Sequence, residues 1–588
     1  MSLWIDPEAV TVTEALRAAV GGHPLVTEAL ARRGLTDVDA ARAFLDPAYY
    51  TPASPFELPD MEPAVARVAG AIDQGERIAV WGDFDVDGQT ATTLLVTALR
   101  DLGADVTYHI PVREKEGHGV NIPVLRRLID EGVRMVLTCD TGVAAHAAVD
   151  FAAARGVDVV ITDHHDLPPA LPDAHAVVNP ARLPAGHALR TLPGVGVAYK
   201  LAEALYSRAG RAGDVAQHLD LVALGIVVDV ALQTGDTRYL LQRGIEALRR
   251  TERPGLLEMM KLADISPAYL TESDIAFGLG PRLNALGRLG DAGVAVEFLT
   301  TGDLERARIL AAELEGLNAR RRMLSDQVYE GALVQIERDP ALQADAALVL
   351  AHPGWDAGVL GIVASRLVER FHKPAVLIKA PPDGLGRGSA RSVEGCDITA
   401  AIAAHAAMLA GFGGHPMAAG LSIEPARIDA FRRALSRTVR AQCDALAAEP
   451  ALRIDAYLPL SELSLDLARA LRRLAPFGAG NPPLTLASRD LALSSYRTST
   501  ARAGTCCSQW RTPRARRSRC SGSGAMRTPC RRGASTWRTP FRPARIGARC
   551  SCRFSGSRRA RSRRRTSPRR ARRSRWWTVA TRLTHKPP

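Results

Sequence analysis

The sequence has 588 residues, enough for about three or four domains, and 46% of them are hydrophobic, which is typical of globular proteins. No apolar run reaches the roughly 18 residues that a membrane-spanning helix needs. The first ten residues carry acids where a secretory signal would carry basic residues. These features exclude a membrane-spanning protein and predict a cytoplasmic one.

The net charge of +14 is distributed unevenly along the chain. Residues 491–588 contain 27 Arg, one Lys and no acid, a charge of +28, which leaves −14 for residues 1–490. Basic proteins often bind nucleic acids. A basic charge confined to one segment does not by itself predict that function.

In chain order, the pattern begins with short helices and then changes to β-rich runs that alternate with amphipathic helices. This alternation predicts a parallel sheet with helices on both faces. A mainly helical stretch, a second α/β unit and the start of a small β domain follow. The predicted parts are 1–45 (helical segment), 46–265 (first α/β domain), 266–335 (helical connector), 336–445 (second α/β domain), 446–495 (partial β domain) and 496–588 (Arg-rich tail).

Beyond about residue 495, neither helical nor strand periodicity is visible, and six of the nine cysteines lie there without the spacing of a zinc site. Disordered basic arms rarely contain so many Cys and Trp residues. We therefore predict either a disordered arm or a segment read in the wrong frame, which resequencing of codons 490–510 tests. The other cysteines, Cys139, Cys396 and Cys443, are too scattered to predict a disulfide framework.

The strongest motif is RIAVWGDFDVDG, an apolar strand followed by Asp83, Asp85, Asp87 and Gly88. Alternate residues of an extended strand face the same side, so the three carboxylates are predicted to project together. Ligand sites of open α/β sheets lie at the carboxyl ends of the strands. Gly88 permits a tight turn into a helix whose N-terminal amides could hold phosphate oxygens.

Acids and histidines recur at later positions of the same kind. Asp140 follows VRMVLTC, Asp163, His164 and His165 follow VDVVIT, and Asp229 lies in the apolar run LVALGIVVDVA. Carboxylates that converge repel one another unless cations neutralise them. Carboxylates with one or two imidazoles suit manganese or magnesium, and two such ions form the usual clamp for hydrolysis of phosphate esters.

Each motif has a simpler interpretation when taken alone. A DxDxDG segment is more often a calcium loop, although the downstream Glu of that loop is missing here. A single Asp after a strand, such as Asp140, is often a helix cap, and two adjacent histidines are usually surface residues. Their joint recurrence at successive strand ends favours the metal site.

The four motifs resemble those of the DHH phosphoesterase family. The resemblance implies that Asp85, Asp87, Asp140, His164 and Asp229 are metal ligands. It also implies that Asp163 and His165 support the centre, with His165 in contact with phosphate, and that Asp83 is a ligand or an acceptor beside one.

Within this family, further segments resemble the RecJ-type exonucleases, which gives the six parts their expected identities. The first domain is then the DHH catalytic domain, the second the DHH-associated domain, and the β segment a partial OB-fold. The segments are LPGVGVAYKLAEAL (192–205), FGLGPRLNALGRLGDAG (277–293), GRGSARS (386–392), GFGGHPMAAG (411–420) and LAPFGAGNP (474–482). The pattern departs at Asp356, where the family commonly has His, and it is lost near residue 495.

The resemblance implies 5′ to 3′ removal of mononucleotides from single-stranded DNA in recombination and repair. The implied substrate-binding residues are Arg113, His118, Arg282, Asn284, Arg288, Ser389, Arg391 and His415. The simpler alternatives are a flexible loop for GRGSARS, a buried structural role for His415 and ordinary ion pairs for Arg282 and Arg288. The implied partners are single-stranded DNA and also a single-strand-binding protein and a helicase.

Two other functions stay open at this point. One is hydrolysis of short oligonucleotides or cyclic dinucleotides, against which the PFGAGNP segment argues. The other is a non-catalytic replication scaffold, against which the intact acidic motifs argue.

Overall fold

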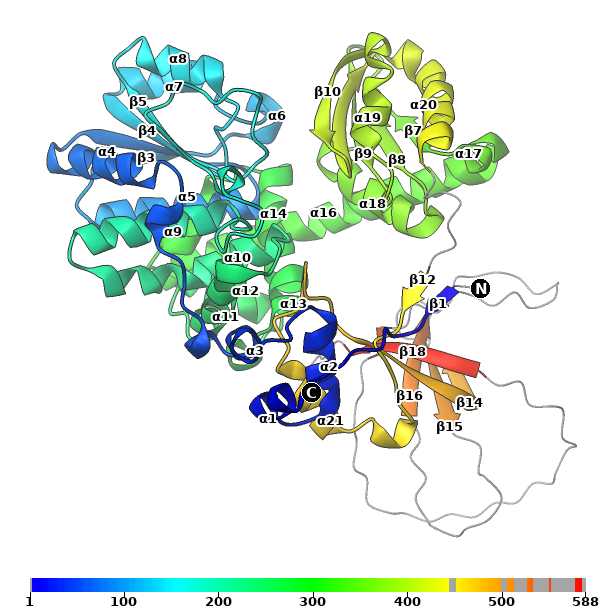
Figure 1. Cartoon of the computed structure of the whole chain (residues 1–588). Coiled ribbons are helices and arrows are strands. Elements are labelled where there is room, and N and C mark those ends of the chain that lie inside the picture. The colour runs from blue at the N-terminus through cyan, green and yellow to red at the C-terminus, as the bar shows by residue number, and fades with distance from the viewer. Residues whose placement is uncertain are drawn as a thin grey trace, which may run out of the picture. The chain divides into compact units, whose positions relative to one another are not determined.

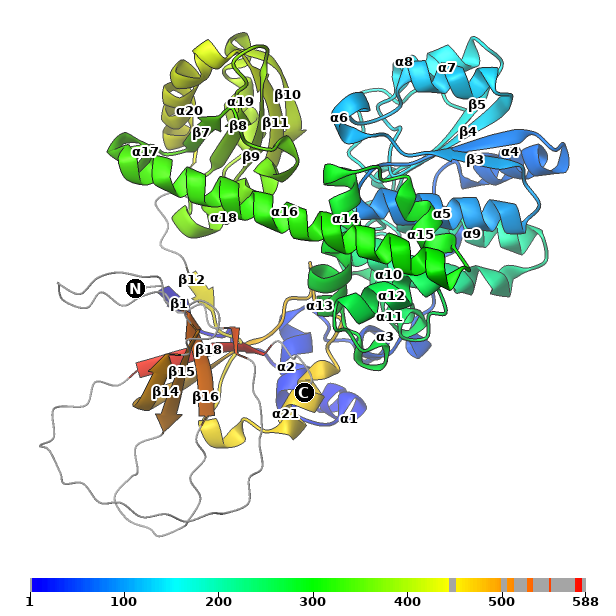
Figure 2. The same cartoon turned by 180° about the vertical axis from the view of Figure 1, so that it is seen from behind.

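The computed structural model describes residues 3–443, 451–498, 505–511, 526–531, 549–550 and 577–583. The chain forms two compact units. Unit 1 comprises Met1–Ala53, Val230–Arg243 and Glu449–Pro588, and unit 2 comprises Ser54–Asp229 and Gly244–Ala448. Figures 1 and 2 show their elements from opposite sides. In the part of the chain described, no helix is both long and apolar enough to cross a bilayer.

Unit 2 contains the predicted parallel sheet, with strand order β3-β2-β4-β5-β6. The five strands alternate with helices up to β5, as the sequence pattern predicts, so this part of the fold prediction is confirmed. They are β2 (Arg77–Trp81), β3 (Val106–His109), β4 (Val133–Cys139), β5 (Asp158–Thr162) and β6 (Ala176–Val178).

Helices cover both faces of this sheet (Figure 1). On one face, apolar side chains of α7 and α8 pack on β2, β4 and β5 in a core that includes Leu128, Val136 and Val149. The other face is covered by α5 and α9. The helices of this region are α4 (Met61–Asp73), α5 (Val86–Asp101), α6 (Arg113–Glu116), α7 (Ile122–Asp130), α8 (His146–Ala153), α9 (Gly194–Arg208) and α10 (Leu219–Val228).

A mainly helical stretch follows, as predicted, and it ends in the 35-residue helix α16. A π-helical turn, Ile275–Leu279, leads directly into α14. The helices are α11 (Gly235–Arg249), α12 (Pro254–Leu262), α13 (Glu272–Asp274), α14 (Gly280–Leu289), α15 (Val294–Thr300), α16 (Leu304–Arg338) and α17 (Pro340–Ala344).

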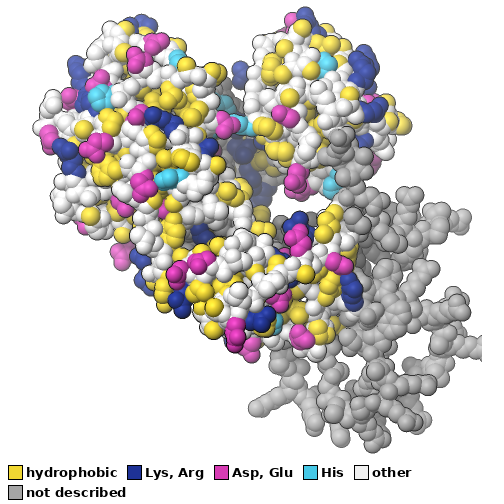
Figure 3. Space-filling model, viewed as in Figure 1, with side chains coloured by type: hydrophobic (Ala, Val, Ile, Leu, Met, Phe, Trp, Pro, Cys, Tyr) yellow, Lys and Arg dark blue, Asp and Glu magenta, His cyan; other side chains and the backbone are white. Residues whose placement is uncertain are grey.

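The second α/β part of unit 2 has a mixed sheet with strand order β10-β11-β9-β8-β7. One face packs on α16 and α18, and the other packs on α19 and α20. Figure 3 shows apolar, basic and acidic side chains interspersed over the viewed surface. The elements are β7 (Leu348–His352), α18 (Leu360–Phe371), β8 (Ala375–Lys379), β9 (Gly386–Arg391), α19 (Ile398–Ala403), β10 (Leu409–His415), β11 (Ala418–Ile423) and α20 (Ile428–Gln442).

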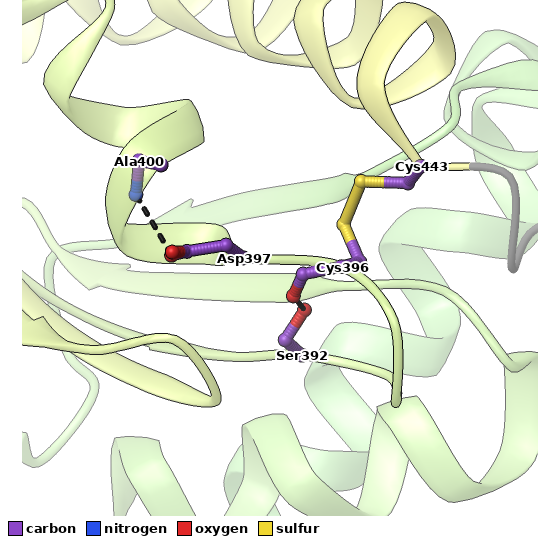
Figure 4. The surroundings of a disulfide bond; sticks show 5 residues. All are labelled: Ser392, Cys396, Asp397, Ala400 and Cys443. Atoms are coloured by element: carbon purple, nitrogen blue, oxygen red, sulfur yellow. Dashed lines mark hydrogen bonds between the residues drawn. A yellow bond between two sulfur atoms is a disulfide. The ribbon is translucent and has the colours of Figure 1, made fainter.

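A disulfide joins Cys396 to Cys443, which lie 47 residues apart in the sequence with Cα atoms 5.0 Å apart (Figure 4). The prediction that the three body cysteines are too scattered for a disulfide is therefore wrong for these two, because the fold brings the loop after β9 against the end of α20. Cys139 is a free, buried thiol. Ser392 closes the same loop by donating a hydrogen bond to the carbonyl of Cys396 (2.6 Å).

Unit 1 combines the N-terminal helices with the β domain. Val26 and Leu30 of the N-terminal helices share one core with Leu471 and Leu486. Its elements are β1 (Leu3–Ile5), α1 (Glu14–Val20), α2 (Pro24–Arg32), α3 (Val38–Leu45), β12 (Ala451–Arg453), β13 (Ala456–Tyr457), α21 (Leu465–Arg472), β14 (Thr485–Thr498), β15 (Thr505–Arg511), β16 (Met526–Arg531), β17 (Arg549–Cys550) and β18 (Trp577–Leu583).

Four of these strands, β15 to β18, lie in the Arg-rich tail, where no strand pattern is visible in the sequence. β14 pairs with both β15 and β18. The zinc question for the tail cysteines, Cys506, Cys507, Cys520, Cys530, Cys550 and Cys552, lies outside the side chains that the structure describes. The alternative of a shifted reading frame stays a prediction.

Candidate metal centre

The three acids of the first motif do converge, but by a different geometry from the one predicted. β2 ends at Trp81, Asp85 is the N-cap of α5, and Asp87 lies in the first turn of that helix. The prediction that they alternate along an extended strand is therefore wrong. Gly88 is required for close approach, because a Cβ there would lie 2.5 Å from the carbonyl oxygen of Asp83.

The other acids and histidines arrive from neighbouring elements. β4 lies between β2 and β5, so Asp140 after β4 and the Asp163-His164-His165 triplet after β5 meet the first motif at one sheet edge. Asp140 donates its backbone N–H to the carbonyl of Thr162 (3.0 Å) and has a φ of 59°. Asp229 directly follows helix α10.

Three groups of side chains at this edge have ligand atoms within 4.8 Å of one another. The groups are Asp83, Asp85 and Asp140; Asp87, His164 and Asp229; and Asp140, His164 and His165. The first two of these groups share no residue, which leaves room for two ions.

Burial favours the protonated form of these carboxyl groups in the absence of a cation. Burial and then the charge of Asp85 raise the pKa of Asp83 to about 7. The pKa values of Asp87 and Asp140 are raised well above the usual range, chiefly by burial and then by neighbouring carboxylates. Burial also raises the pKa of Asp229 and lowers that of His164.

Asp87 is oriented by the start of helix α9. Its two carboxylate oxygens accept hydrogen bonds from the backbone N–H groups of Gly194 (2.6 Å) and Val195 (2.9 Å). The positive end of the helix dipole therefore faces this carboxylate. A Cβ at Gly194 would lie 2.5 Å from Cβ of Asp140. The sequence motif around Gly194 gave no direct sign of this role, which depends on a contact between residues more than 100 positions apart.

Asp163 is occupied by protein hydrogen bonds. It accepts them from the backbone of Val143 (2.9 Å), the backbone of His164 (2.7 Å) and Nδ1 of His165 (2.8 Å). Burial raises the pKa of Asp163, but the hydrogen bond and charge of His165, together with the bond from Val143 and the charge of His164, outweigh burial, so the net pKa is lowered. The hydrogen bond that His165 donates to Asp163 raises the pKa of His165 to about 9, so His165 is a cationic donor held in place.

The donor set fits manganese or magnesium. Oδ1 of Asp140 is buried and has no hydrogen-bond partner among the described residues, although Nε2 of His164 lies only 3.0 Å away. Two atoms this close without hydrogen-bond geometry are suited to share a cation. Carboxylate oxygens with one or two imidazoles are the ligands expected for manganese, and for magnesium with more water in its shell.

Arg113 and His118 lie over the motif itself. The guanidinium of Arg113 is 5.1 Å from the ring centroid of Phe84, and the ring of His118 is 4.7 Å from the same ring. The loop that carries them is fastened by Glu116, which accepts a hydrogen bond from the backbone of Val112 (3.1 Å) and lies 2.8 Å from Nε2 of His109.

The GRGSARS segment forms strand β9 rather than a flexible loop. Its Arg391 and Arg288 of α14 interact with the charge of Arg113. Arg391 donates to Oγ of Ser389 (3.3 Å), and Arg288 donates to the carbonyl of Gly358 (3.2 Å). Burial and then Arg113 lower the pKa of Arg391. Asp356, the departure from the family pattern, accepts from the N–H of Gly358 (2.9 Å).

The remaining predicted substrate residues have different surroundings. Arg282 is ion-paired with Glu315 (2.5 Å) and donates to the carbonyl of Gly278 (2.6 Å), as its simpler interpretation required. Asn284 lies on α14 between the two arginines. The side chain of His415 is exposed and its Nδ1 is 3.2 Å from Asp166, so a buried structural role is wrong for it.

Family comparisons agree with this architecture. The chain matches the DHH family N-terminal domain over residues 77–226, the DHHA1 domain over 344–441 and the RecJ OB domain over 454–510. The last match continues beyond residue 495, where the sequence pattern is lost.

Similar proteins cover most of the chain. It is 38% identical over 445 residues to the single-stranded-DNA-specific exonuclease RecJ of Dickeya dadantii, covering 72% of this chain and 77% of that protein. It is 36% identical to the protein of the same name from Bacillus subtilis, with 78% of this chain but only 58% of that protein covered. A crystal structure of RecJ from Thermus thermophilus in complex with Mn²⁺ has a TM-score of 0.75 and 28% identity, covering 91% of this chain and 77% of that one. The chain belongs to the RecJ family of DHH-domain proteins.

Proposed function

We propose that the protein is a metal-dependent exonuclease specific for single-stranded DNA that acts in recombination and repair. The observation that carries this proposal is the convergence of seven acid and imidazole side chains at one sheet edge. Family membership supports the same activity, because the relatives carry that name. Two Mn²⁺ or Mg²⁺ ions there would supply an activated water and neutralise the charge that develops on phosphate.

The protein residues have two further roles, which are ion binding and contact with the phosphate. Asp85, Asp87, Asp140, His164 and Asp229 would hold the ions, and Asp83, a member of the group with Asp85 and Asp140, would be a further ligand or an acceptor beside one. The imidazolium of His165, fixed by Asp163, donates a hydrogen bond to a phosphate oxygen.

We further propose 5′ to 3′ polarity with release of mononucleotides. Arg113, Arg391 and Ser389 bind the terminal 5′ phosphate, because Arg113 lies over Phe84 of the first acidic motif and its charge acts on Arg391, which donates to Ser389. His118, Asn284, Arg288 and His415 contact the following strand. Arg282 supports α14 through Glu315.

The six-part division of the chain, from the helical segment 1–45 to the tail 496–588, accompanies this proposal as its domain assignment. A cytoplasmic location is proposed with it. The proposed partners are a single-strand-binding protein and a helicase, which would deliver single strands to the enzyme.

A degradation assay tests the proposal. The full chain is incubated with Mn²⁺ and with single- or double-stranded DNA labelled at the 5′ or the 3′ end. We expect mononucleotides from the single strand alone, with the 5′ label released first. Cleavage of dinucleotides or trinucleotides only would indicate an oligonucleotide hydrolase, and binding without cleavage would indicate a scaffold.

A further inference from the structure

Helices α14 and α16 pack against each other, and a Cβ at Gly290 would lie 3.3 Å from Cδ1 of Leu317. Four arginines lie on these two helices and on two other elements of unit 2. They are Arg113 of α6, Arg288 of α14, Arg321 of α16 and Arg391 of β9. The hydrogen-bond acceptors of three of them are neutral: the carbonyl of Gly358 for Arg288, Oδ1 of Asn318 for Arg321 (2.9 Å), and Oγ of Ser389 with the carbonyl of Ala390 for Arg391. Arg113 stacks on Phe84.

The four charges are close enough to disturb one another. Burial, followed by the charges of Arg113, Arg321 and Arg391, lowers the pKa of Arg288 to about 10. The carboxylates that oppose this effect, Asp85 for Arg288 and Asp83 with Asp85 for Arg113, belong to the metal centre. The arginine group therefore lacks a counterion of its own among the described side chains.

Arg288 is the arginine whose pKa all three of the others lower. Arg113 acts on both Arg288 and Arg391, whereas Arg321 acts on Arg288 from the side of α16. A terminal phosphate carries at most about two negative charges, so it cannot balance four guanidinium groups. Asp83 and Asp85 act on Arg113 and Arg288 but not on Arg321, so a further anionic group would be favoured on the side of Arg321.

The two arginines whose charges act on Arg321, Arg322 of α16 and Arg282 of α14, do not share this property. Arg322 is ion-paired with Oε1 of Glu315 (3.0 Å), and Arg282 is ion-paired with the other oxygen of the same carboxylate. Arg321 instead has a buried Nε without a hydrogen-bond partner in the part of the chain described. Its guanidinium is thus placed for a ligand, while those of Arg282 and Arg322 are neutralised by the protein.

We propose that Arg321, together with Arg288, forms a second anion subsite that binds an internal phosphodiester of the single strand, distinct from the terminal and the cleaved phosphates. This inference rests on the proposed function. Arg321 then fixes the direction in which the strand runs along α14 and α16, and it contributes to binding rather than to the chemical step.

The test compares Arg321→Gln and Arg321→Lys with the control Arg322→Gln, using a long 5′-phosphorylated oligothymidylate and the dinucleotide pTpT with Mn²⁺. For R321Q we expect KM on the long strand to rise roughly 10-fold with kcat unchanged. The logarithmic salt dependence of binding should become shallower by about 0.7, the value for one phosphate contact on a single strand. Lysine should restore part of the affinity, and pTpT should be unaffected because it has no further phosphate.

Several outcomes overturn the inference. R321Q that behaves as R322Q does, or that impairs pTpT as much as the long strand, contradicts an internal subsite. The strand is also titrated by fluorescence anisotropy without metal, so that binding is measured even if the wild-type protein does not cleave. In that case the proposed exonuclease activity fails, while the affinity difference between R321Q and R322Q still decides the subsite.

Discussion

The sheet edge and the arginine group both bring like charges close together, but the charges are negative at the sheet edge and positive in the arginine group. At the sheet edge, carboxylates such as Asp87 and Asp140 are buried together, and at the arginine group Arg288 is buried among like charges. The acids come from short motifs at the ends of adjacent elements, whereas the arginines come from positions between 113 and 391. Among the described side chains, carboxylates outnumber cations at the sheet edge, and the four arginines form no ion pair, as expected of sites that bind cations and a polyanion.

The largest expected loss of activity comes from changing a carboxylate at the sheet edge. Asp140→Asn removes a carboxylate shared by two of the ligand groups. We expect kcat/KM with Mn²⁺ to fall by at least about 100-fold, because a metal ion contributes several kcal/mol to charge stabilisation. In the absence of metal, the melting temperature should rise, since one buried like charge is lost. A variant that keeps both its activity and the stabilisation by Mn²⁺ would argue against the metal centre.

A smaller effect is expected one step away from the ligands. Asp163→Asn removes the negative charge beside His165 and one of the two carboxylate oxygens that accept hydrogen bonds, and it should lower kcat roughly 10- to 100-fold, as losses of supporting partners do. Asp158→Asn is the matched control, because Asp158 lies at the other end of the same strand in an ion pair with Arg67. Steady-state kinetics of the two variants separate orientation of the site from general damage to β5.

Substitutions in the arginine group should change KM more than kcat. Arg391→Gln should raise KM roughly 10-fold for a 5′-phosphorylated strand and much less for a 5′-hydroxyl strand, because a charge-assisted hydrogen bond to the terminal phosphate is lost. Arg387→Gln, an exposed position on the same strand β9, is the control. Equal losses on both substrates would place Arg391 outside the terminal phosphate site.

A buried ionisable group outside both clusters should affect stability only. Burial and then Arg253 lower the pKa of His218 from 6.5 to about 4. Between these values the unfolded chain binds a proton that the folded chain does not, so the free energy of unfolding should fall as the pH drops from 6.5 towards 4, by up to about 3 kcal/mol. Urea unfolding of His218→Gln should show a weaker pH dependence, whereas His175→Gln, at an exposed site, should retain it.

The sequence predicts the metal edge better than its details. Strands of a parallel sheet bring their carboxyl ends together, which is why Asp140 and His164 could be predicted to meet. The turn that makes Asp85 a helix cap, and the amides of Gly194 and Val195 that hold Asp87, depend on contacts that no local period encodes.

The second half of unit 2 was less accessible from sequence. A Gly- and Ser-rich segment is compatible with either a loop or a strand, and only the pairing of β9 with β8 and β11 decides between them. The neutralisation of Arg282 by Glu315, beside an unneutralised Arg321, depends on the packing of α14 against α16. Charge balance of this kind is a property of the assembled fold.

The bond between Cys396 and Cys443 closes a covalent ring around α19, β10, β11 and α20. A protease that cuts the backbone within this ring leaves both pieces attached until a thiol reagent separates them. Whether this region separates into fragments after a cut therefore depends on whether its surroundings are reducing. Gel mobility after nicking, with and without reductant, reads that dependence directly.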